Sequence, residues 1–250
     1  MCGIFFLKTL KEEEIITKEK AELVLETHFN RGPDERATVI CKEWMMIHTR
    51  LAITSPNNGH QPITNNSKTA YMVFNGEIYN YIELSIEYNL FEDNNFSDTD
   101  LLFKLIEVIG FKDAIKKLRG MFAIVYYDLR NKKIYTARDH FGQKPLWIYK
   151  NDGIIAFSST IKALITYFNV EIDLSKVIHL ISKQGKVCPS ETIYRSIKGM
   201  RAGVINQFDS KFNEESIIYF NHRNLIDSDL YKENLDCPIS RLDFSIKETI

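Results

Sequence analysis

The chain has 250 residues, of which 44% are hydrophobic and 26% charged, and its formal net charge is −1 at pH 7. This length suits one large domain or two small ones with a substantial core. The near-neutral charge gives no electrostatic reason to expect binding to nucleic acid or to an anionic membrane surface. No apolar run reaches the roughly 20 residues of a spanning helix, and the N-terminus lacks the pattern of a signal peptide, so we expect a cytoplasmic protein.

The cysteines argue against a structural metal. Four of them occur, widely and irregularly spaced, at Cys2, Cys41, Cys188 and Cys237. They form no CxxC pair and have no histidine at a zinc-ligand spacing, so we expect free thiols and no metal in this chain.

The first half of the chain alternates strand and helix patterns. We expect a helix at 18–30, because Ala21, Val24, Leu25 and His28 share one helical face. The segment "RGPDE" then predicts a loop at 31–35, since glycine followed by proline cannot continue a helix. Strands are expected at 3–8, 37–42, 44–53 and 69–74.

Two further patterns follow the last of these strands. Asn75-Gly76 is a strong turn signal directly after the strand. Residues 99–118 return to helical spacing, with Leu102, Leu105 and Ile106 on one side.

Residues 121–139 are the most informative for the fold. In "MFAIVYYD" both alternating faces are apolar, which predicts a strand covered on both sides, and "KIYTARD" is expected to return antiparallel beside it. A hairpin turning at 151–153 and another within 203–220 are predicted similarly. Hairpin-linked sheets with accompanying helices indicate an α+β architecture of sheet packed on sheet, with helices outside.

The tail differs from the rest. After the hairpin comes a polar stretch, and Leu242, Ile246 and Ile250 are spaced as on a helix. We expect residues 206–250 to form a hairpin, a linker and the start of a helix leading towards a synthetase domain that is absent here. On this interpretation the chain is a fragment or one half of a divided enzyme.

Cys2 is the first candidate for chemistry. Removal of Met1 would leave it with a free α-amine, whose pKa near ~7.7–8.0 keeps a usable neutral fraction at cell pH. One residue would then supply both a thiol nucleophile and its base. The alternative is that Cys2 is only a small apolar residue at the start of a strand.

Asn75, Gly76 and Arg50 could complete such a site. The Asn75 amide and the Gly76 backbone N–H could hold an oxyanion, although a plain hairpin turn is the alternative. Arg50 lies in an apolar strand pattern and so needs an anionic partner. That partner could be a substrate carboxylate or, in a purely structural ion pair, Asp34 or Asp139.

Asp98 could hold an ammonium group, but Ser97 and Asp98 also stand where a helix N-cap is expected. Nucleophile, oxyanion donors, carboxylate clamp and ammonium clamp together describe a site for an amino acid with a side-chain amide. Glutamine and asparagine both fit this chemistry.

Nine short motifs support a family resemblance in addition to this chemistry. In order, "MCGIFF", "RGPD", "HTRLAI", "HQPI", "NGEIYN", "SDTD", "LRGMFAIVYYD", "ARDHFGQKPLW" and "IKAL" resemble the class II glutamine amidotransferase domain of the glutamine-dependent asparagine synthetase family. The resemblance covers roughly residues 1–205, which we expect to form the glutaminase domain. It implies the N-terminal nucleophile hydrolase fold, a four-layer αββα sandwich of two antiparallel sheets.

The resemblance also implies catalytic roles. Cys2 would form a γ-glutamyl thioester and release ammonia, and Asn75 and Gly76 would form the oxyanion hole. The loop at 31–34 would have a supporting role only.

Substrate-binding roles are implied in the same way. Arg50 and the backbones of Leu51 and Ile53 would bind the glutamine α-carboxylate. Glu77 and Asp98 would hold the α-ammonium group.

Two departures from the family concern the ammonia acceptor. Thr160 stands where the family often has glutamate before "IKAL", which puts coupling to a synthetase in doubt. No SGG-type or Walker-type phosphate loop occurs, so the chain itself needs no cofactor, and ATP and Mg²⁺ are expected only in the absent synthetase domain.

The favoured interpretation is a glutamine-hydrolysing enzyme domain that supplies ammonia to an asparagine synthetase-type partner. An amidotransferase module for a sugar or natural-product acid is one alternative, and a non-catalytic interaction module is another. The expected partners are L-glutamine and a synthetase domain or subunit. Formation of a homo-oligomer is left as an open alternative. We expect low glutaminase activity until an acceptor domain docks and the loops near Arg31 and Ser55 become ordered.

Overall fold

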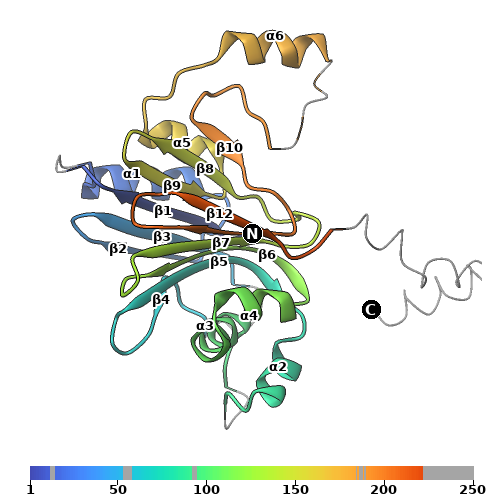
Figure 1. Ribbon diagram of the computed structural model, residues 1–250. Helices are drawn as coiled ribbons and strands as arrows, with labels where there is room; N and C mark the ends of the chain where they lie inside the picture. Colours follow the sequence, from blue (N-terminus) through green and yellow to red (C-terminus); the bar gives the residue numbers. More distant parts are fainter. Residues whose placement is uncertain are drawn as a thin grey trace, which may run out of the picture.

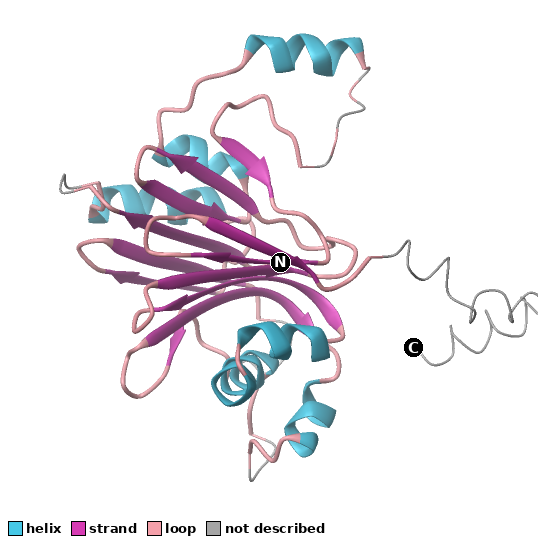
Figure 2. Cartoon of the chain, viewed as in Figure 1, coloured by secondary structure: helices cyan, strands magenta, loops and turns pink. Residues whose placement is uncertain are grey.

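The computed structural model describes residues 1–11, 15–52, 58–91, 95–183, 185, 188 and 190–221. Two six-stranded sheets lie face to face, and helices cover both outer faces (Figure 1 and Figure 2). Neighbouring strands in both sheets are antiparallel. The predicted α+β, four-layer αββα sandwich is confirmed.

The first sheet is covered by helices α1 and α5. Its strand order is β10 (Ile197–Gly199), β8 (Trp147–Asn151), β9 (Ile154–Ser158), β1 (Gly3–Thr9), β3 (Trp44–Arg50) and β2 (Glu35–Ile40). The two helices are α1 (Lys18–His28) and α5 (Ile161–Tyr167).

The second sheet is covered by helices α2, α3 and α4. Its strand order is β12 (Glu214–Ile218), β11 (Val204–Phe208), β7 (Lys133–Arg138), β6 (Gly120–Asp128), β5 (Ala70–Ile78) and β4 (Ile63–Thr64). The three helices are α2 (Tyr81–Glu87), α3 (Asp98–Ile109) and α4 (Phe111–Lys117).

Three apolar cores separate the four layers, and the central strand β6 contributes to two of them. Phe122, Ile124 and Tyr126 pack towards α3 and α4, while the alternate residues Ala123, Val125 and Tyr127 pack between the sheets. This confirms the prediction that both faces of this strand are covered. Burial of each large apolar side chain contributes about 1.5–3 kcal/mol.

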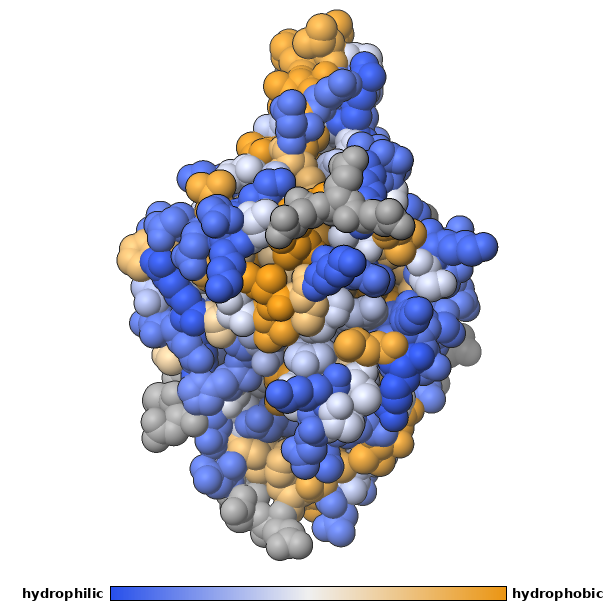
Figure 3. Space-filling model, turned by 90° about the vertical axis from the view of Figure 1, so that its left-hand side faces the viewer, coloured by the Kyte–Doolittle hydropathy of each residue, from blue (hydrophilic) through white to orange (hydrophobic). Residues whose placement is uncertain are grey.

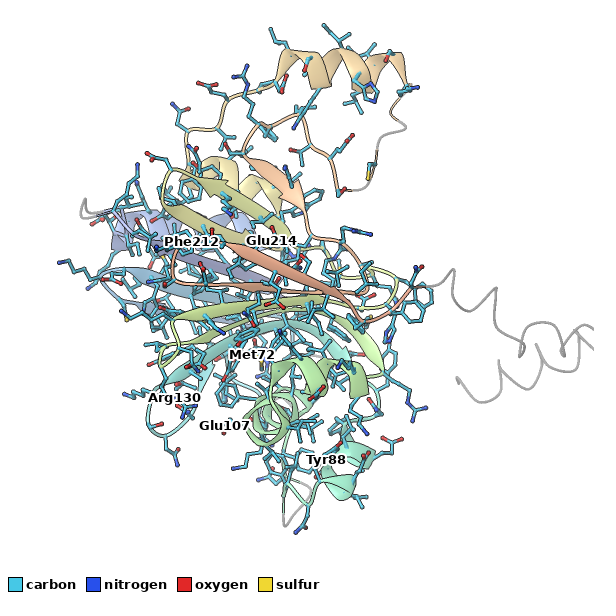
Figure 4. The ribbon with its side chains drawn as sticks, viewed as in Figure 1. Met72, Tyr88, Glu107, Arg130, Phe212 and Glu214 are labelled. Carbon is cyan, nitrogen blue, oxygen red and sulfur yellow. The ribbon has the colours of Figure 1, made fainter. Side chains whose placement is uncertain are left out.

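Other side chains mark the same division. Met72, on β5, belongs to the core beneath the helices, whereas Phe212, between β11 and β12, belongs to the core between the sheets (Figure 4). The third core lies between the first sheet and helices α1 and α5.

The predicted hairpins are confirmed. β6 pairs with β7, β8 with β9, and β11 with β12. The turn between β8 and β9 uses Asp152 and Gly153, both with positive φ, as the Asn-Asp-Gly signal indicates.

The turn prediction at Asn75-Gly76 is wrong. β5 continues through both residues to Ile78 and pairs with β6 along its whole length, with Gly76 opposite Phe122. Nine paired positions outweigh a two-residue turn preference, because β propensity depends strongly on tertiary context.

The helical spacing predicted over 99–118 is confirmed, and it is divided between two helices, α3 and α4. Gly110, with a φ of 82°, separates α3 from α4, and its N–H donates to the Ile106 carbonyl. Glycine adopts this left-handed region without steric cost, so the chain changes direction here.

Helix α6 (Leu174–Ser182) was not expected. Its apolar residues at i, i+3, i+4 and i+7, following the N-cap residue Asp173, would have indicated it. It projects from the sandwich at the top of Figure 1. No helix in the described ranges is long and apolar enough to cross a membrane.

The β11–β12 hairpin continues the second sheet across the domain boundary expected at residue 205. The expected linker and terminal helix at 222–250 lie outside the described residues. The expected division into 1–205 and 206–250 stays a prediction.

Candidate active site

A cavity opens where the first residues of the chain meet the ends of strands from both sheets. Cys2 immediately precedes β1, and the β1–β3 register sets Gly3 opposite Thr49, so Cys2 lies next to the end of β3. β5 and the start of α3 form the opposite wall. The cavity is lined by Met1, Cys2, Arg50, Leu51, Gly59, Gln61, Phe74, Asn75, Gly76, Glu77, Ser97, Asp98, Thr99, Met121 and Lys144.

The structure therefore brings seven of the eight candidate site residues to one place. These are Cys2, Arg50, Leu51, Asn75, Gly76, Glu77 and Asp98. The eighth, Ile53, and the expected loop around Ser55 lie outside the described residues.

The Cys2 thiol is half-buried and rests on the backbone of Leu51. The Leu51 N–H donates to Sγ at 3.5 Å, and the Leu51 carbonyl lies 3.8 Å from Sγ. Burial raises the pKa of this thiol, whereas the Leu51 N–H and the charges of the Met1 α-amino group and Arg50 lower the pKa. Arg31 donates from Nε to the Cys2 carbonyl at 3.0 Å, which fixes the backbone of the candidate nucleophile.

The other cysteines lie elsewhere. Cys41 and Cys188 are exposed, and neither lines the cavity. All three described cysteines have free thiols, while Cys237 lies outside the described residues. The described residues contain no group of three His, Cys, Asp or Glu side chains placed to hold a metal ion.

Asn75 carries a buried amide with an unused donor. Its side chain is 1% exposed, and Nδ2 has no hydrogen-bond partner within the described ranges. A buried N–H without a partner costs about 1–3 kcal/mol. Such an orphan donor in a cavity wall is available to a ligand.

Gly76 is required by close packing. A Cβ atom at this position would lie 2.0 Å from the Met121 carbonyl oxygen on the paired strand. Only glycine therefore allows β5 and β6 to stay in register beside Asn75.

Arg50 reaches the cavity from the end of β3 and is buried. The structural ion pair considered with Asp34 or Asp139 is not formed. Instead Nη1 lies 3.4 Å from Glu35 Oε2, and Nη2 donates to the Asn58 carbonyl at 2.5 Å. Asp34 accepts from the Ala52 N–H, and Asp139 binds the backbone of its own loop.

The N-cap of α3 is Ser97, not Asp98. Ser97 and Asp100 form a reciprocal capping box, which satisfies the first turn of the helix. Asp98 lies one residue into the helix, and its Oδ2 accepts from the Ile78 N–H at 3.1 Å. Burial raises the pKa of the Asp98 carboxyl to about 6, with a smaller contribution from the charge of Glu77.

Several cavity residues were missed from sequence. Gln61 is buried, accepts from the Phe74 N–H at 2.6 Å and donates to Thr99 at 3.4 Å. Its motif "HQPI" was among those of the resemblance but suggested no role. Met121 and Lys144 also line the wall, and no short-range pattern indicates where their side chains point.

Thr160, the departure noted above, has a structural task. Its hydroxyl caps α5 by accepting from the Ala163 N–H at 3.2 Å, and it lies 3.1 Å from Nε2 of His28 on α1. It therefore joins the two helices that cover the first sheet.

Known proteins are similar to this chain in sequence and in overall fold. Residues 1–219 match the family described as glutamine amidotransferase domain. An asparagine synthetase [glutamine-hydrolyzing] of Zea mays is 34% identical over 165 residues, covering 66% of this chain and 28% of the relative. Asparagine synthetase B of Escherichia coli K12 is 30% identical over 75% of this chain and 34% of its own length.

A third relative is asparagine synthetase [glutamine-hydrolyzing] 1 of Bacillus subtilis 168, which is 33% identical over 81% of this chain and 33% of its own length. Among solved structures, the glutamine phosphoribosylpyrophosphate amidotransferase of B. subtilis, complexed with ADP and GMP, superposes with a TM-score of 0.60. That match covers 87% of this chain and 49% of the other at 18% identity, and it supports the fold alone.

The chain belongs to the glutamine amidotransferase domain family, as the motifs indicated. It spans about a third of the length of the asparagine synthetases it matches.

Proposed function

We propose that this domain hydrolyses L-glutamine to glutamate and ammonia through a thioester on Cys2. The observation that carries the proposal is the cavity that joins the Cys2 thiol with the orphan amide donor of Asn75. Arg50 and Asp98, on the same walls, have charges that complement the two ends of an amino acid.

The chain's own groups can account for each step. The neutral α-amine takes the thiol proton, and Sγ attacks the γ-carbonyl carbon while the carbonyl electron pair moves to oxygen. We assign the oxyanion donors to Asn75 Nδ2 and the Gly76 N–H. Collapse breaks the C–N bond, and the leaving group takes the amine's proton to depart as ammonia. Water then cleaves the thioester by the same proton route, giving glutamate and the free thiol.

Charge complementarity orients the substrate. Arg50, together with the backbone of Leu51 and Ile53, would hold the α-carboxylate. Asp98 and Glu77 would hold the α-ammonium group. Because the pKa of Asp98 is about 6, its carboxyl is mostly ionised at pH 7.

Removal of Met1 is part of the proposal. Met1 is half exposed and lines the cavity, so its loss leaves the new α-amine of Cys2 at the same wall.

The acceptor of the ammonia is proposed from the relatives. They are named asparagine synthetases, and this chain matches about a third of their length. We propose that a synthetase domain or subunit, using ATP and Mg²⁺, accepts the ammonia, and that its docking raises glutaminase activity. Glutamate release should rise when such a partner is added.

Cys2→Ala tests the hydrolysis, with Cys41→Ala as the matched control. The Cys2 variant should fold with an unchanged melting temperature and release no glutamate, because no other described cysteine lines the cavity. Cys41→Ala should keep the full rate. Glutamate release by folded Cys2→Ala protein at the unsubstituted rate would refute the mechanism.

A further inference from the structure

The edge of strand β5 at residues 73–78 has no neighbouring strand in the described part of the chain. β4 is the last strand of the sheet, and it pairs only with Tyr71 and Met72. We call the side of β5 beyond these two residues the open edge. Because nearly all buried N–H groups are hydrogen-bonded, those on the open edge depend on side chains or on a ligand for their acceptors.

Gly76 directs its backbone groups to the open edge. It stands opposite Phe122 of β6, whose N–H donates to Asp139 Oδ2 at 3.2 Å and whose carbonyl accepts from the Asp139 N–H at 2.9 Å. Asp139 follows β7, on the other side of β6, so Phe122 turns its polar groups away from β5. The Gly76–Phe122 pair is therefore a position without hydrogen bonds between the strands, and the Gly76 N–H points to the open edge and the cavity.

Gln61 and Asp98 accept the N–H groups on either side of Gly76. Along a strand the N–H groups of alternate residues point the same way, so those of residues 74, 76 and 78 share the open edge. The Phe74 N–H donates to Gln61 Oε1 at 2.6 Å, and the Ile78 N–H donates to Asp98 Oδ2 at 3.1 Å. Each bonded N–H lies about 7 Å along the strand from that of Gly76. The Gly76 N–H is thus held between two fixed neighbours.

Gln61 also joins the open edge to helix α3. Its residue is 6% exposed, and its Nε2 donates to Thr99 Oγ1 at 3.4 Å. Thr99 follows Asp98 in the first turn of the helix. One buried amide therefore connects the strand that contributes Gly76 to the helix that contributes Asp98.

We propose that Gln61 is a positioning residue that holds the open edge of β5 so that the Gly76 N–H points at the reacting carbonyl oxygen. This inference rests on the proposed function, in which that N–H stabilises the oxyanion. A displacement of about 1 Å in a reacting geometry lowers the rate by on the order of 100-fold. Loss of the Gln61 bond should therefore lower kcat, whereas KM, which depends on Arg50 and Asp98, should change little.

Gln61→Asn and Gln61→Glu test whether the reach of the side chain matters. Asparagine is one methylene shorter and falls short of the Phe74 N–H, so kcat for glutamine should fall about 10–100-fold while KM stays within about threefold. Glutamate keeps an oxygen at the original reach, so Gln61→Glu should retain most of kcat.

Asn80→Ala is the matched control. Asn80 is another buried amide that accepts a backbone N–H, from Arg119 at 2.8 Å, and it does not line the cavity. This variant should keep kcat even if its melting temperature falls. Alkylation of Cys2 by iodoacetamide forms no oxyanion, so its rate should be the same in all of these proteins.

Amide hydrogen exchange over residues 73–78, followed by mass spectrometry, gives a measurement without turnover. Exchange should be faster in Gln61→Asn than in the unsubstituted chain and unchanged in Gln61→Glu. An unchanged kcat in Gln61→Asn, a raised KM with kcat spared, or equal losses of kcat in Gln61→Asn, Gln61→Glu and Asn80→Ala would each overturn the inference. If exchange rises in Gln61→Asn but the unsubstituted chain releases no glutamate, the proposed function fails while the hold of Gln61 on β5 stands.

Discussion

The cavity end of the sandwich and helix α6 represent two extremes of packing in this domain. Around the cavity, buried polar groups such as Asp139 and Gln61 bind backbone N–H groups of neighbouring segments. In α6, by contrast, no residue is buried, and Leu174, Ile178 and Ile181 are 67–72% exposed. These side chains account for the apolar surface at the top of Figure 3.

The two regions also differ in how many segments of the fold they contact. α6 is joined to residues 193–195 by a few bonds, including the Asp173 N–H to the Ile193 carbonyl at 2.8 Å. The cavity walls come from both sheets and from α3. Buried hydrogen-bonded side chains are thus found near the cavity, where the proposed chemistry needs fixed geometry, since preorganised donors contribute most to catalysis.

The largest effect on stability is expected at Asp139. Asp139→Ala leaves four backbone N–H groups without their acceptor, so the free energy of unfolding should fall by about 3 kcal/mol or more. Urea unfolding measures this loss.

Asp209→Ala is its matched control. Asp209 binds two backbone N–H groups in an exposed loop, so its loss should change the unfolding midpoint far less. If both variants lost the same free energy of unfolding, backbone N–H groups near the cavity would be no more dependent on their acceptor than those of an exposed loop.

Asn75→Ala is expected to have the next largest effect, on activity. Loss of one oxyanion donor should lower kcat by about 10²–10³-fold with little change in KM. No hydrogen bond from Nδ2 is lost on substitution, because this atom has no partner in the described part of the chain.

Asn206→Ala provides the control for Asn75. Asn206 is equally a buried asparagine of the second sheet, but it bonds Thr136 and Ser216 away from the cavity. It should keep kcat. A variant at Asn75 that raised KM and spared kcat would contradict the oxyanion role.

Asp98→Asn should act on binding and on pH dependence. Because burial raises the folded-state pKa to about 6 from an ordinary 3.8, the protonated carboxyl stabilises the fold. That stabilisation is fully present below about pH 4 and is lost as pH rises through about 6. Asp98→Asn should therefore raise the melting temperature at pH 7 and flatten its change between about pH 4 and 6.

The same variant should raise KM for glutamine roughly tenfold or more, because the ammonium group loses a charged partner. Melting curves and initial rates across pH measure the two effects. A lower melting temperature at pH 7 together with an unchanged KM would disprove both roles of Asp98.

The smallest effect is expected in α6. Ile178→Lys adds a charge to a side chain already 67% exposed, so the free energy of unfolding should change by less than about 0.5 kcal/mol. Leu164→Ala in α5, where the residue is fully buried, should cost about 2–5 kcal/mol. A large loss at Ile178 would show that α6 packs on the domain.

The sandwich could be predicted from the sequence because the patterns that indicate it lie within short segments. Strand β6 has apolar residues on both faces, and the Asn-Asp-Gly turn defines a hairpin without reference to the rest of the fold. The turn expected at Asn75-Gly76 failed because pairing with β6 is a long-range effect. The same pairing is what places the Asn75 amide in the cavity wall.

Only those site residues whose functional group is itself distinctive could be predicted from the sequence. Cys2, Arg50 and Asp98 could be inferred from chemistry and motif, since each has a distinct functional group. The structural alternative for Arg50, an ion pair with Asp34 or Asp139, was wrong, because Glu35 reaches Arg50 across the β2–β3 pair. A substrate carboxylate as the partner of Arg50 stays a prediction. Lys144 lines the cavity without any short-range pattern that indicates where its side chain points.

The central claim is that the Cys2 sulfur attacks the glutamine γ-carbonyl. Protein mixed with glutamine, quenched in acid and digested, should yield an N-terminal peptide lacking Met1 and carrying a γ-glutamyl group on Cys2, detectable by mass spectrometry. Rapid release of glutamate with no such adduct at any quench time, in protein whose N-terminal methionine is retained, would contradict the account.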